Sequence, residues 1–262
     1  MLGSDWAANE SGCDLLQGAV EWQPGFRWGL CVGVSEMANS NRKSDEEMTF
    51  AAVPKAVVSR LSLYLRELQQ LLSEGKETVR SGELGSRLGF TDAQVRKDLT
   101  YFGQFGYPGI GYRTDELVQA IRQILGTDIE WRVVIVGIGN LGRALLGYKG
   151  FASQGFQIVA AVDADPKKAG LKVEGVEVHP IEQLGKIVKR CRARLGMVAV
   201  PAAAAQNVVD QLVEAGVEGI VNFAPMTINL PEHVSHVGVD LASELEQITF
   251  AVAKRWHAQQ QS

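Results

Sequence analysis

The sequence predicts an α/β protein in which a winged helix-turn-helix precedes a Rossmann dinucleotide-binding domain, and three observations support this. Residues 51–126 show helical periodicity followed by a glycine-rich hairpin and a further helix. In residues 127–241, strand-like apolar runs alternate with helical or turn segments, which is typical of a parallel sheet. The segment Gly137–Gly142 has the spacing G-x-G-x-x-G directly after the first of those runs.

The N-terminal 50 residues differ from the rest of the chain. They mix Gly, Ser and Asn with scattered Trp, and they end in a polar run at 39–47. Such a composition buries too little apolar surface to offset the entropy of folding, so residues 1–50 are expected to be a disordered leader. Met37 and Met48 are alternative first residues that the sequence leaves open.

Four helices and a hairpin are expected in residues 51–126, the first beginning at a proline, a residue that suits the first helical position. Gly75, Gly89 and Gly126 end three of the helices, and Thr91 begins another with a capping box, since Gln94 lies three residues on. The helices are expected at 54–75, 81–89, 91–102 and 114–125, and the hairpin at 103–112. This order predicts a winged helix-turn-helix; a small helical cap on the following domain is the alternative.

The third helix has the features of a recognition helix, within a helix-turn-helix of about Tyr64 to Gly103. Val95, Leu99 and Phe102 share one stripe, which must face the core. The opposite arc carries cations for phosphates or guanine edges, a hydroxyl group and small residues, at Ala93, Arg96, Lys97, Thr100 and Tyr101. For the two cations, a solvated helix face is the alternative. The net charge of −4 excludes a globally basic nucleic-acid binder, so DNA contact must depend on local placement.

The glycine-rich loop predicts a phosphate-binding turn in a sheet whose strands are expected at 133–136, 157–162, 197–200, 219–223 and 237–239. Gly137 permits a tight turn, Gly139 lets the backbone approach a pyrophosphate, and Gly142 lets the helix pack close to the strand. A glycine turn without a ligand is the alternative. Asp163 follows the second strand, where a carboxylate binds the ribose hydroxyls and disfavours a 2′-phosphate, so NAD(H) is expected rather than NADP(H). Asp165 is an alternative for this role, and either residue could instead cap the turn at Pro166.

Several classes of protein are disfavoured by what the sequence lacks. Its three cysteines are too dispersed for a disulfide framework or a metal site, and no signal peptide precedes them, so a reducing cytoplasm is expected. No apolar stretch approaches the roughly 20 residues of a membrane span. The four histidines form no convincing catalytic site, and His179 is expected in a loop. We therefore do not expect this protein to be an enzyme. Two alternatives remain: a small NAD-dependent dehydrogenase with a helical appendage, and a CoA-binding module.

Over residues 54–257 the sequence resembles the Rex family of redox-sensing transcriptional repressors. The shared motifs are Ser59-Arg60-Leu61, Tyr64-Leu65-Arg66, Gln94 to Leu99, Tyr101-Phe102-Gly103, Gly109 to Tyr112, the Gly137–Gly142 loop, Tyr148, Gly150-Phe151, Val200-Pro201, Asn222 to Pro225 and Val239-Asp240-Leu241. The resemblance implies a homodimer that binds operator DNA at an inverted repeat and is released by NADH but not by NAD⁺.

The resemblance also implies further site residues. The cofactor site would include Ile138, Asn140 and Leu141 of the loop together with Tyr148, Pro201, Asn222 and Phe223. Arg66, Tyr148 and Asp240 would form a set that rearranges between two states. Within residues 242–262, a helix at about Ala242 to Trp256 would exchange between subunits.

Overall fold

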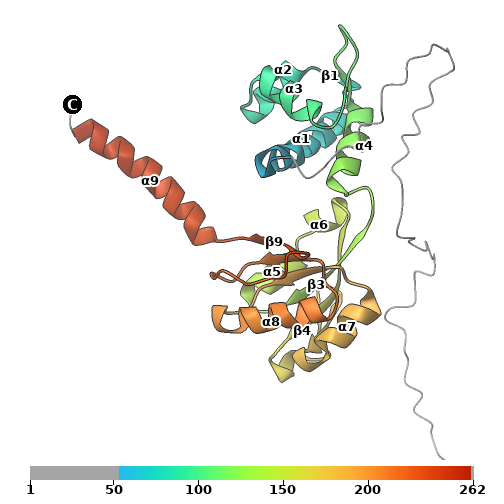
Figure 1. Cartoon of the computed structure of the whole chain (residues 1–262), viewed down its shortest axis with the longest axis vertical. Coiled ribbons are helices and arrows are strands. Elements are labelled where there is room, and N and C mark those ends of the chain that lie inside the picture. Colours follow the sequence, from blue (N-terminus) through green and yellow to red (C-terminus); the bar gives the residue numbers. More distant parts are fainter. Residues whose placement is uncertain (1–52, 261–262) are drawn as a thin grey trace, which may run out of the picture. The chain divides into compact units, whose positions relative to one another are not determined.

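The computed structural model describes residues 53–260 (Figure 1). The predicted disordered leader at 1–50 lies outside the described residues. No helix within 53–260 combines the length and the apolar character that crossing a membrane would require.

The first part of the described chain is a winged helix-turn-helix, as predicted. Its elements are α1 (Lys55–Ser73), β1 (Thr78–Val79), α2 (Ser81–Leu88), α3 (Asp92–Thr100), β2 (Tyr112–Arg113) and α4 (Thr114–Leu125). Helices α2 and α4 end at Gly89 and Gly126, which take left-handed conformations with φ of 74° and 67°. Apolar faces of the four helices meet in one core that includes Leu61, Leu84 and Val95.

Three details of this part differ from the sequence-based expectations. Residues 103–112 form a turn closed by one bridge between Tyr107 and Gly111, and not a full hairpin. The paired strands are β1 and β2, and β1 was not predicted. At the start of α3, the Thr91 hydroxyl accepts the Gln94 backbone N–H at 3.1 Å, and the Gln94 side-chain amide donates to Asp98. Among the described residues no return bond joins the Thr91 N–H to the Gln94 side chain, so only half of the capping box is formed.

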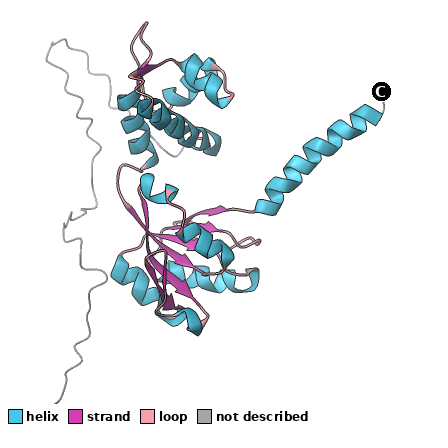
Figure 2. Ribbon diagram, turned by 180° about the vertical axis from the view of Figure 1, so that it is seen from behind, coloured by secondary structure: helices cyan, strands magenta, loops and turns pink. Residues whose placement is uncertain are grey.

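The second part is a sheet covered by helices (Figure 2). Its elements are β3 (Trp131–Val136), α5 (Asn140–Leu146), α6 (Gly150–Ser153), β4 (Phe156–Asp163), the 3₁₀ turn Pro166–Lys168, β5 (Lys172–Val173), β6 (Val176–Pro180), the 3₁₀ turn Ile181–Gln183, α7 (Leu184–Cys191), β7 (Leu195–Val198), α8 (Ala202–Glu214), β8 (Gly219–Asn222) and β9 (Ser235–Gly238). The sheet order is β5-β6-β4-β3-β7-β8-β9, parallel except for the β5–β6 edge pair. Its six parallel strands have the Rossmann order, which reverses between β3 and β7.

Alternate residues of the central strand β3 face opposite sides of the sheet. Val134 and Val136 belong to a core with residues of α7 and α8, whereas Val133 and Ile135 belong to a second core against α5 and α6. A strand buried on both faces is why this run is continuously apolar. The sequence did not predict β5 and β6, and His179, expected in a loop, lies in β6.

The last element is the helix α9 (Leu241–Gln260), which agrees with the expected helix to within a few residues. Five apolar residues recur every three or four positions along one face, at Leu241, Leu245, Ile248, Val252 and Trp256, whereas the exposed Phe250 lies on the opposite face. Four of the five are at least 60% exposed, Val252 being the exception. Within a single copy, this apolar stripe therefore remains largely open to solvent.

Candidate functional site: a glycine loop and an exposed helix face

The three glycines of the phosphate-binding loop differ in what the fold requires of them. Gly137 has φ of 96°, and a Cβ added there would overlap the carbonyl oxygen of Ala199 beyond β7. A Cβ on Gly142 would overlap the carbonyl oxygen of Gly137, which explains why α5 can start so close to β3. Gly139 has φ of −80°, which any residue can adopt, and no heavy atom lies within 4 Å of an added Cβ. Neither the backbone angle nor the packing therefore requires a glycine at 139.

The loop lies at the carboxyl ends of the parallel strands, beside the reversal of strand order. Ala199 donates its N–H to Val136 at 2.8 Å, which joins the ends of β7 and β3. Ile138 is buried, whereas Gly139, Asn140 and Leu141 are exposed. Open α/β sheets bind ligands at such a reversal, outside the carboxyl ends of the strands. The open side of the loop thus has the position and the backbone access of a nucleotide site.

Asp163 ends β4 and is bonded within the protein. Its Oδ2 accepts the Ile138 N–H at 2.6 Å and the Lys168 Nζ at 2.9 Å, and its Oδ1 accepts the Asp165 N–H at 2.8 Å. Burial alone would raise the pKa of Asp163, but these donors outweigh it and hold that pKa below its ordinary value. The carboxylate therefore fixes the glycine loop against β4, a role the sequence did not reveal. Asp165, the alternative, caps the next turn by accepting the Lys167 N–H at 3.0 Å.

The other residues expected at the cofactor site differ in availability. Pro201 is exposed before α8, and Phe223 is half-buried after β8. The buried Asn222 amide donates to the carbonyls of Ala224 and Met226 at 3.1 and 3.0 Å, and accepts the Ala224 N–H at 3.0 Å. Asn222 therefore shapes the loop after β8 with its side chain.

Tyr148, which follows α5, was expected near the nicotinamide. Its side chain is 58% exposed, and its ring packs edge-on against Phe151 with centroids 4.9 Å apart. This leaves much of the phenol ring open to solvent.

The arc of α3 opposite the core is exposed at each predicted position, from Ala93 to Tyr101. Its two cations are not equivalent. Arg96 pairs with Asp92 at 2.7 Å and contacts Ser81 at 3.2 Å, whereas Lys97 makes no ion pair within residues 53–260. Lys97 is therefore the more available of the two cations for an external phosphate.

A buried charge network, which the sequence did not predict, fixes α3 against α1. Asp98 is fully buried on the inner side of α3 and accepts two bonds from Arg60, at 2.6 and 2.8 Å. The Tyr64 hydroxyl and the Gln94 amide each donate to the same carboxylate at 2.8 Å. Desolvation opposes the charge of Asp98, but these donors lower its pKa overall. The sequence did contain a signal for this network: Asp98 lies beside the apolar stripe of the third helix, and Arg60 lies on the first helix.

The three expected switch residues do not contact one another through hydrogen bonds or ion pairs within a single copy of the described chain. Arg66, Tyr148 and Asp240 are each exposed, and no hydrogen bond or ion pair connects them within the described part of the chain. The Asp240 Oδ1 accepts the N–H groups of Ala242 and Ser243 at 3.0 and 3.4 Å, so it caps α9. The role of the three residues as a switch stays a prediction.

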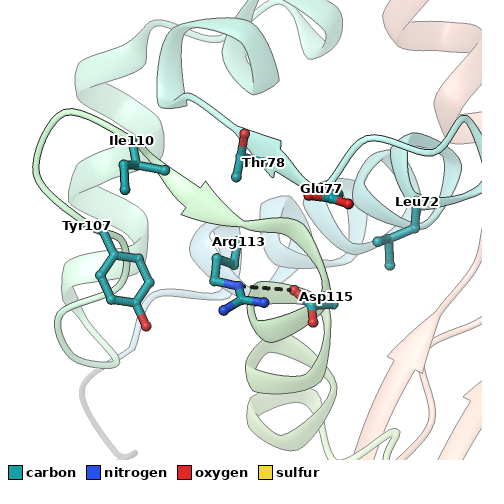
Figure 3. A pocket seen from close by; sticks show the side chains of 7 residues that line it. All are labelled: Leu72, Glu77, Thr78, Tyr107, Ile110, Arg113 and Asp115. Carbon is teal, nitrogen blue, oxygen red and sulfur yellow. Dashed lines mark ion pairs between the residues drawn. The ribbon is translucent and has the colours of Figure 1, made fainter.

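A pocket of about 690 Å³ lies beside the wing turn, the turn at residues 103–112 (Figure 3). Its lining residues are Leu72, Glu77, Thr78, Tyr107, Ile110, Arg113 and Asp115. Arg113 is the cation among them, and it lies 3.9 Å from Asp115 and 3.4 Å from Glu116. Because carboxylates surround this cation, the pocket does not have the chemistry of a phosphate site. Across residues 53–260, no group of His, Cys, Asp and Glu is placed to hold a metal ion.

Comparison with known protein families gives separate matches for the two parts of the chain. Residues 52–100 match the family "Putative DNA-binding protein N-terminus", and residues 128–226 match the family "CoA binding domain". The second match includes the glycine loop Gly137–Gly142, and a CoA-binding module is one of the alternatives that the sequence left open for this part of the chain.

Curated proteins and solved structures extend the similarity over most of the chain. The redox-sensing transcriptional repressor Rex of Carboxydothermus hydrogenoformans is 46% identical over 77% of this chain and 97% of its own. The Rex of Streptomyces coelicolor is 48% identical over 76% of this chain and 77% of its own. The Rex-family repressor RSP, solved with β-NAD⁺ and operator DNA, superposes with a TM-score of 0.75 at 34% identity, covering 79% of this chain and 96% of RSP.

A structure of RSP with β-NADH superposes with a TM-score of 0.72 at 32% identity, covering 80% of this chain and 99% of that one. These relatives are named repressors, which supports the expectation of a regulator rather than an enzyme. The resemblance predicted from the sequence is confirmed. The chain belongs to the Rex family of redox-sensing transcriptional repressors.

Proposed function

We propose that this protein is a cytoplasmic repressor that binds operator DNA as a homodimer and leaves it when NADH binds. Residues 51–126 form the DNA-binding domain in this proposal, residues 127–241 the NAD(H)-binding domain, and residues 242–262 the dimerising helix and tail. The RSP relatives support both ligands, since they were solved with operator DNA and with either oxidation state of the cofactor.

The observation that supports the cofactor most directly is Gly139. Gly139 lies on the open side of a loop at the reversal of strand order, and neither its backbone angle nor its packing requires a glycine. Close approach of a pyrophosphate to the backbone explains the glycine there. Asn140 and Leu141 are exposed on the same loop, and Pro201 and Phe223 follow β7 and β8 at the same edge of the sheet. The solved complexes of relatives favour NAD(H) over CoA for this site.

The DNA-binding face is proposed to be the exposed arc of α3 together with the wing turn. Lys97, free of ion pairs among the described residues, would bind phosphate, and Arg96 would exchange its exposed pair with Asp92 for DNA. Thr100 and Tyr101 add hydroxyl donors on the same arc, and the small Ala93 leaves room for close approach.

The dimer is proposed to form through α9, whose apolar stripe would pack on a second copy. Burying four large side chains that are now at least 60% exposed would supply a substantial hydrophobic contribution to association. Asp240 lies one residue before this helix. Pairing of two chains through α9 would therefore place Asp240 beside the other two expected switch residues, Arg66 and Tyr148. NADH and NAD⁺ would then differ because a neutral ring and a cationic ring favour different arrangements of these charges.

The proposal is tested by selection from a pool of random-sequence DNA duplexes in the presence of NAD⁺. We expect enrichment of an inverted repeat, because a two-fold symmetric dimer binds two equivalent half-sites. Lys97→Ala should bind the selected duplex more weakly and retain its affinity for NADH. Its plot of log binding constant against log salt concentration should be shallower than that of the parent by about one unit of slope. Lys186→Ala, on the exposed surface of α7, is the matched control. Enrichment of no sequence, or equal binding by Lys97→Ala at several salt concentrations, would contradict the proposal.

A further inference from the structure

The end of β4 carries a cation as well as the predicted carboxylate. The Lys168 Nζ lies 2.9 Å from the Asp163 Oδ2, and the two side chains are 23% and 10% exposed. Lys168 belongs to the 3₁₀ turn Pro166–Lys168, so a local turn brings the ammonium group back to the strand end. In a Rossmann fold this position faces the ribose of the bound dinucleotide.

The two groups favour different ligands. A carboxylate here accepts the ribose 2′-hydroxyl, whereas a cation here accommodates a 2′-phosphate. Asp163 has three donors in place, from Ile138, Asp165 and Lys168, out of about four that a carboxylate can accept. One acceptor position is therefore left for a ribose hydroxyl, and the ammonium group is already engaged.

We propose that Lys168 is a specificity-determining residue that acts as one unit with Asp163. Paired, the two charges form a nearly neutral site that accepts a 2′-hydroxyl, and Asp163 withholds the ammonium group from a 2′-phosphate. Without Lys168, the uncompensated carboxylate repels a 2′-phosphate more strongly. Without Asp163, the released ammonium group attracts it. This inference rests on the proposed NAD(H) site and adds how that site discriminates between two dinucleotides.

The pairing makes two substitutions act in opposite directions on one measured ratio, the Kd for NADPH divided by the Kd for NADH. Asp163→Asn should lower this ratio at least about tenfold, the effect of one charge-assisted contact. Lys168→Met should raise it severalfold. The double variant should return close to the ratio of the parent, because neither charge remains.

The experiment is titration of each full-length variant with NADH and NADPH, followed by nicotinamide fluorescence, with a thermal melt of each variant. Lys167→Met is the matched control, since Lys167 is an exposed neighbour in the same turn, and its ratio should not move. Should Asp163→Asn fail to fold, the comparison of Lys168→Met with Lys167→Met still decides, because Asp163 is intact in both.

Three outcomes would overturn the proposal. Asp163→Asn could weaken both nucleotides equally, which would make Asp163 a purely structural residue. Its lowered ratio could persist in the double variant, which would exclude Lys168. Lys168→Met could leave the ratio where Lys167→Met leaves it. A parent protein that binds neither nucleotide would be a different failure, since it would refute the NAD(H) site itself.

Discussion

At the scale of single residues, the three loop glycines separate the needs of the fold from those of the ligand. Gly142→Ala should lower the free energy of unfolding by about 1–3 kcal/mol, because the added methyl group overlaps the Gly137 carbonyl. Gly139→Ala should change the free energy of unfolding by less than about 1 kcal/mol. Its conformation suits alanine and the space is open, which offsets the weaker N-cap that alanine provides for α5.

The same two variants should behave differently toward the cofactor. Gly139→Ala should bind NADH at least about tenfold more weakly, since a methyl group would stand where the backbone approaches the pyrophosphate. Chemical denaturation and titration calorimetry of both variants measure the two effects. A Gly139→Ala protein that folds and binds NADH like the parent would remove the main support for the cofactor site.

Asp98 is the residue on which the position of α3 most depends. Asp98→Asn leaves Arg60 with a weaker partner next to the core, and we expect it to lower the free energy of unfolding by about 2–3 kcal/mol. Operator binding should weaken with it, because α3 carries the DNA-binding arc. Asp92→Asn is the matched control on the same helix, since it removes a pair that is exposed on both sides, and it should change stability little.

The same network predicts a dependence on pH. The pKa of Asp98 is lower in the folded state, so its stabilisation is fully present above about pH 4, the ordinary aspartate pKa, and is lost as the pH falls through the folded-state value. Asp98→Asn should therefore lose less stability than the parent on acidification below about pH 4. Parallel acid profiles for the two proteins would show that Asp98 is not the group responsible.

At the scale of elements, the sequence predicted what depends on local pattern. The apolar spacing of α1 and the glycines after α2 and α4 placed these helices to within two residues, and the loop Gly137–Gly142 identified the Rossmann fold. The strand β6 was missed because it has only five residues and ends in proline, a residue that disfavours central strands. The partners of Asp98 and Asp163 could not be predicted in the same way, because Arg60 and Ile138 reach them through tertiary contacts.

The helix α9 should control assembly through its apolar stripe. Leu245→Glu together with Ile248→Glu places two charges where a second copy is proposed to pack, so the dimer should dissociate at concentrations at which the parent is dimeric. Losing two buried aliphatic side chains costs roughly 1.5–3 kcal/mol each, before the cost of burying charge. Sedimentation velocity measures the result, with Gln247→Glu on another side of the helix as the control. Dimers that persist in the double variant would place the interface elsewhere.

At the scale of the whole molecule, Asp240 tests whether the cofactor site and the DNA-binding face communicate through a charge network. Asp240→Ala should retain operator binding but require more NADH for release, with weaker discrimination against NAD⁺. Its observed role as a cap of α9 makes a different prediction, since losing a cap lowers stability by about 0.5–2 kcal/mol without shifting the release midpoint. Melting temperature and release measured on the same variant separate these roles. Lower stability with an unshifted midpoint would refute the switch.

The central claim is that NADH and operator DNA bind different states of one molecule, and such coupling must be reciprocal. The most direct measurement is fluorescence anisotropy of a labelled operator duplex bound to the full-length protein, titrated in parallel with NADH and with NAD⁺. We predict that NADH releases the duplex while equal concentrations of NAD⁺ leave it bound, and that saturating duplex weakens NADH binding by the same factor. Release by both nucleotides at equal concentrations, or by neither, would contradict the account.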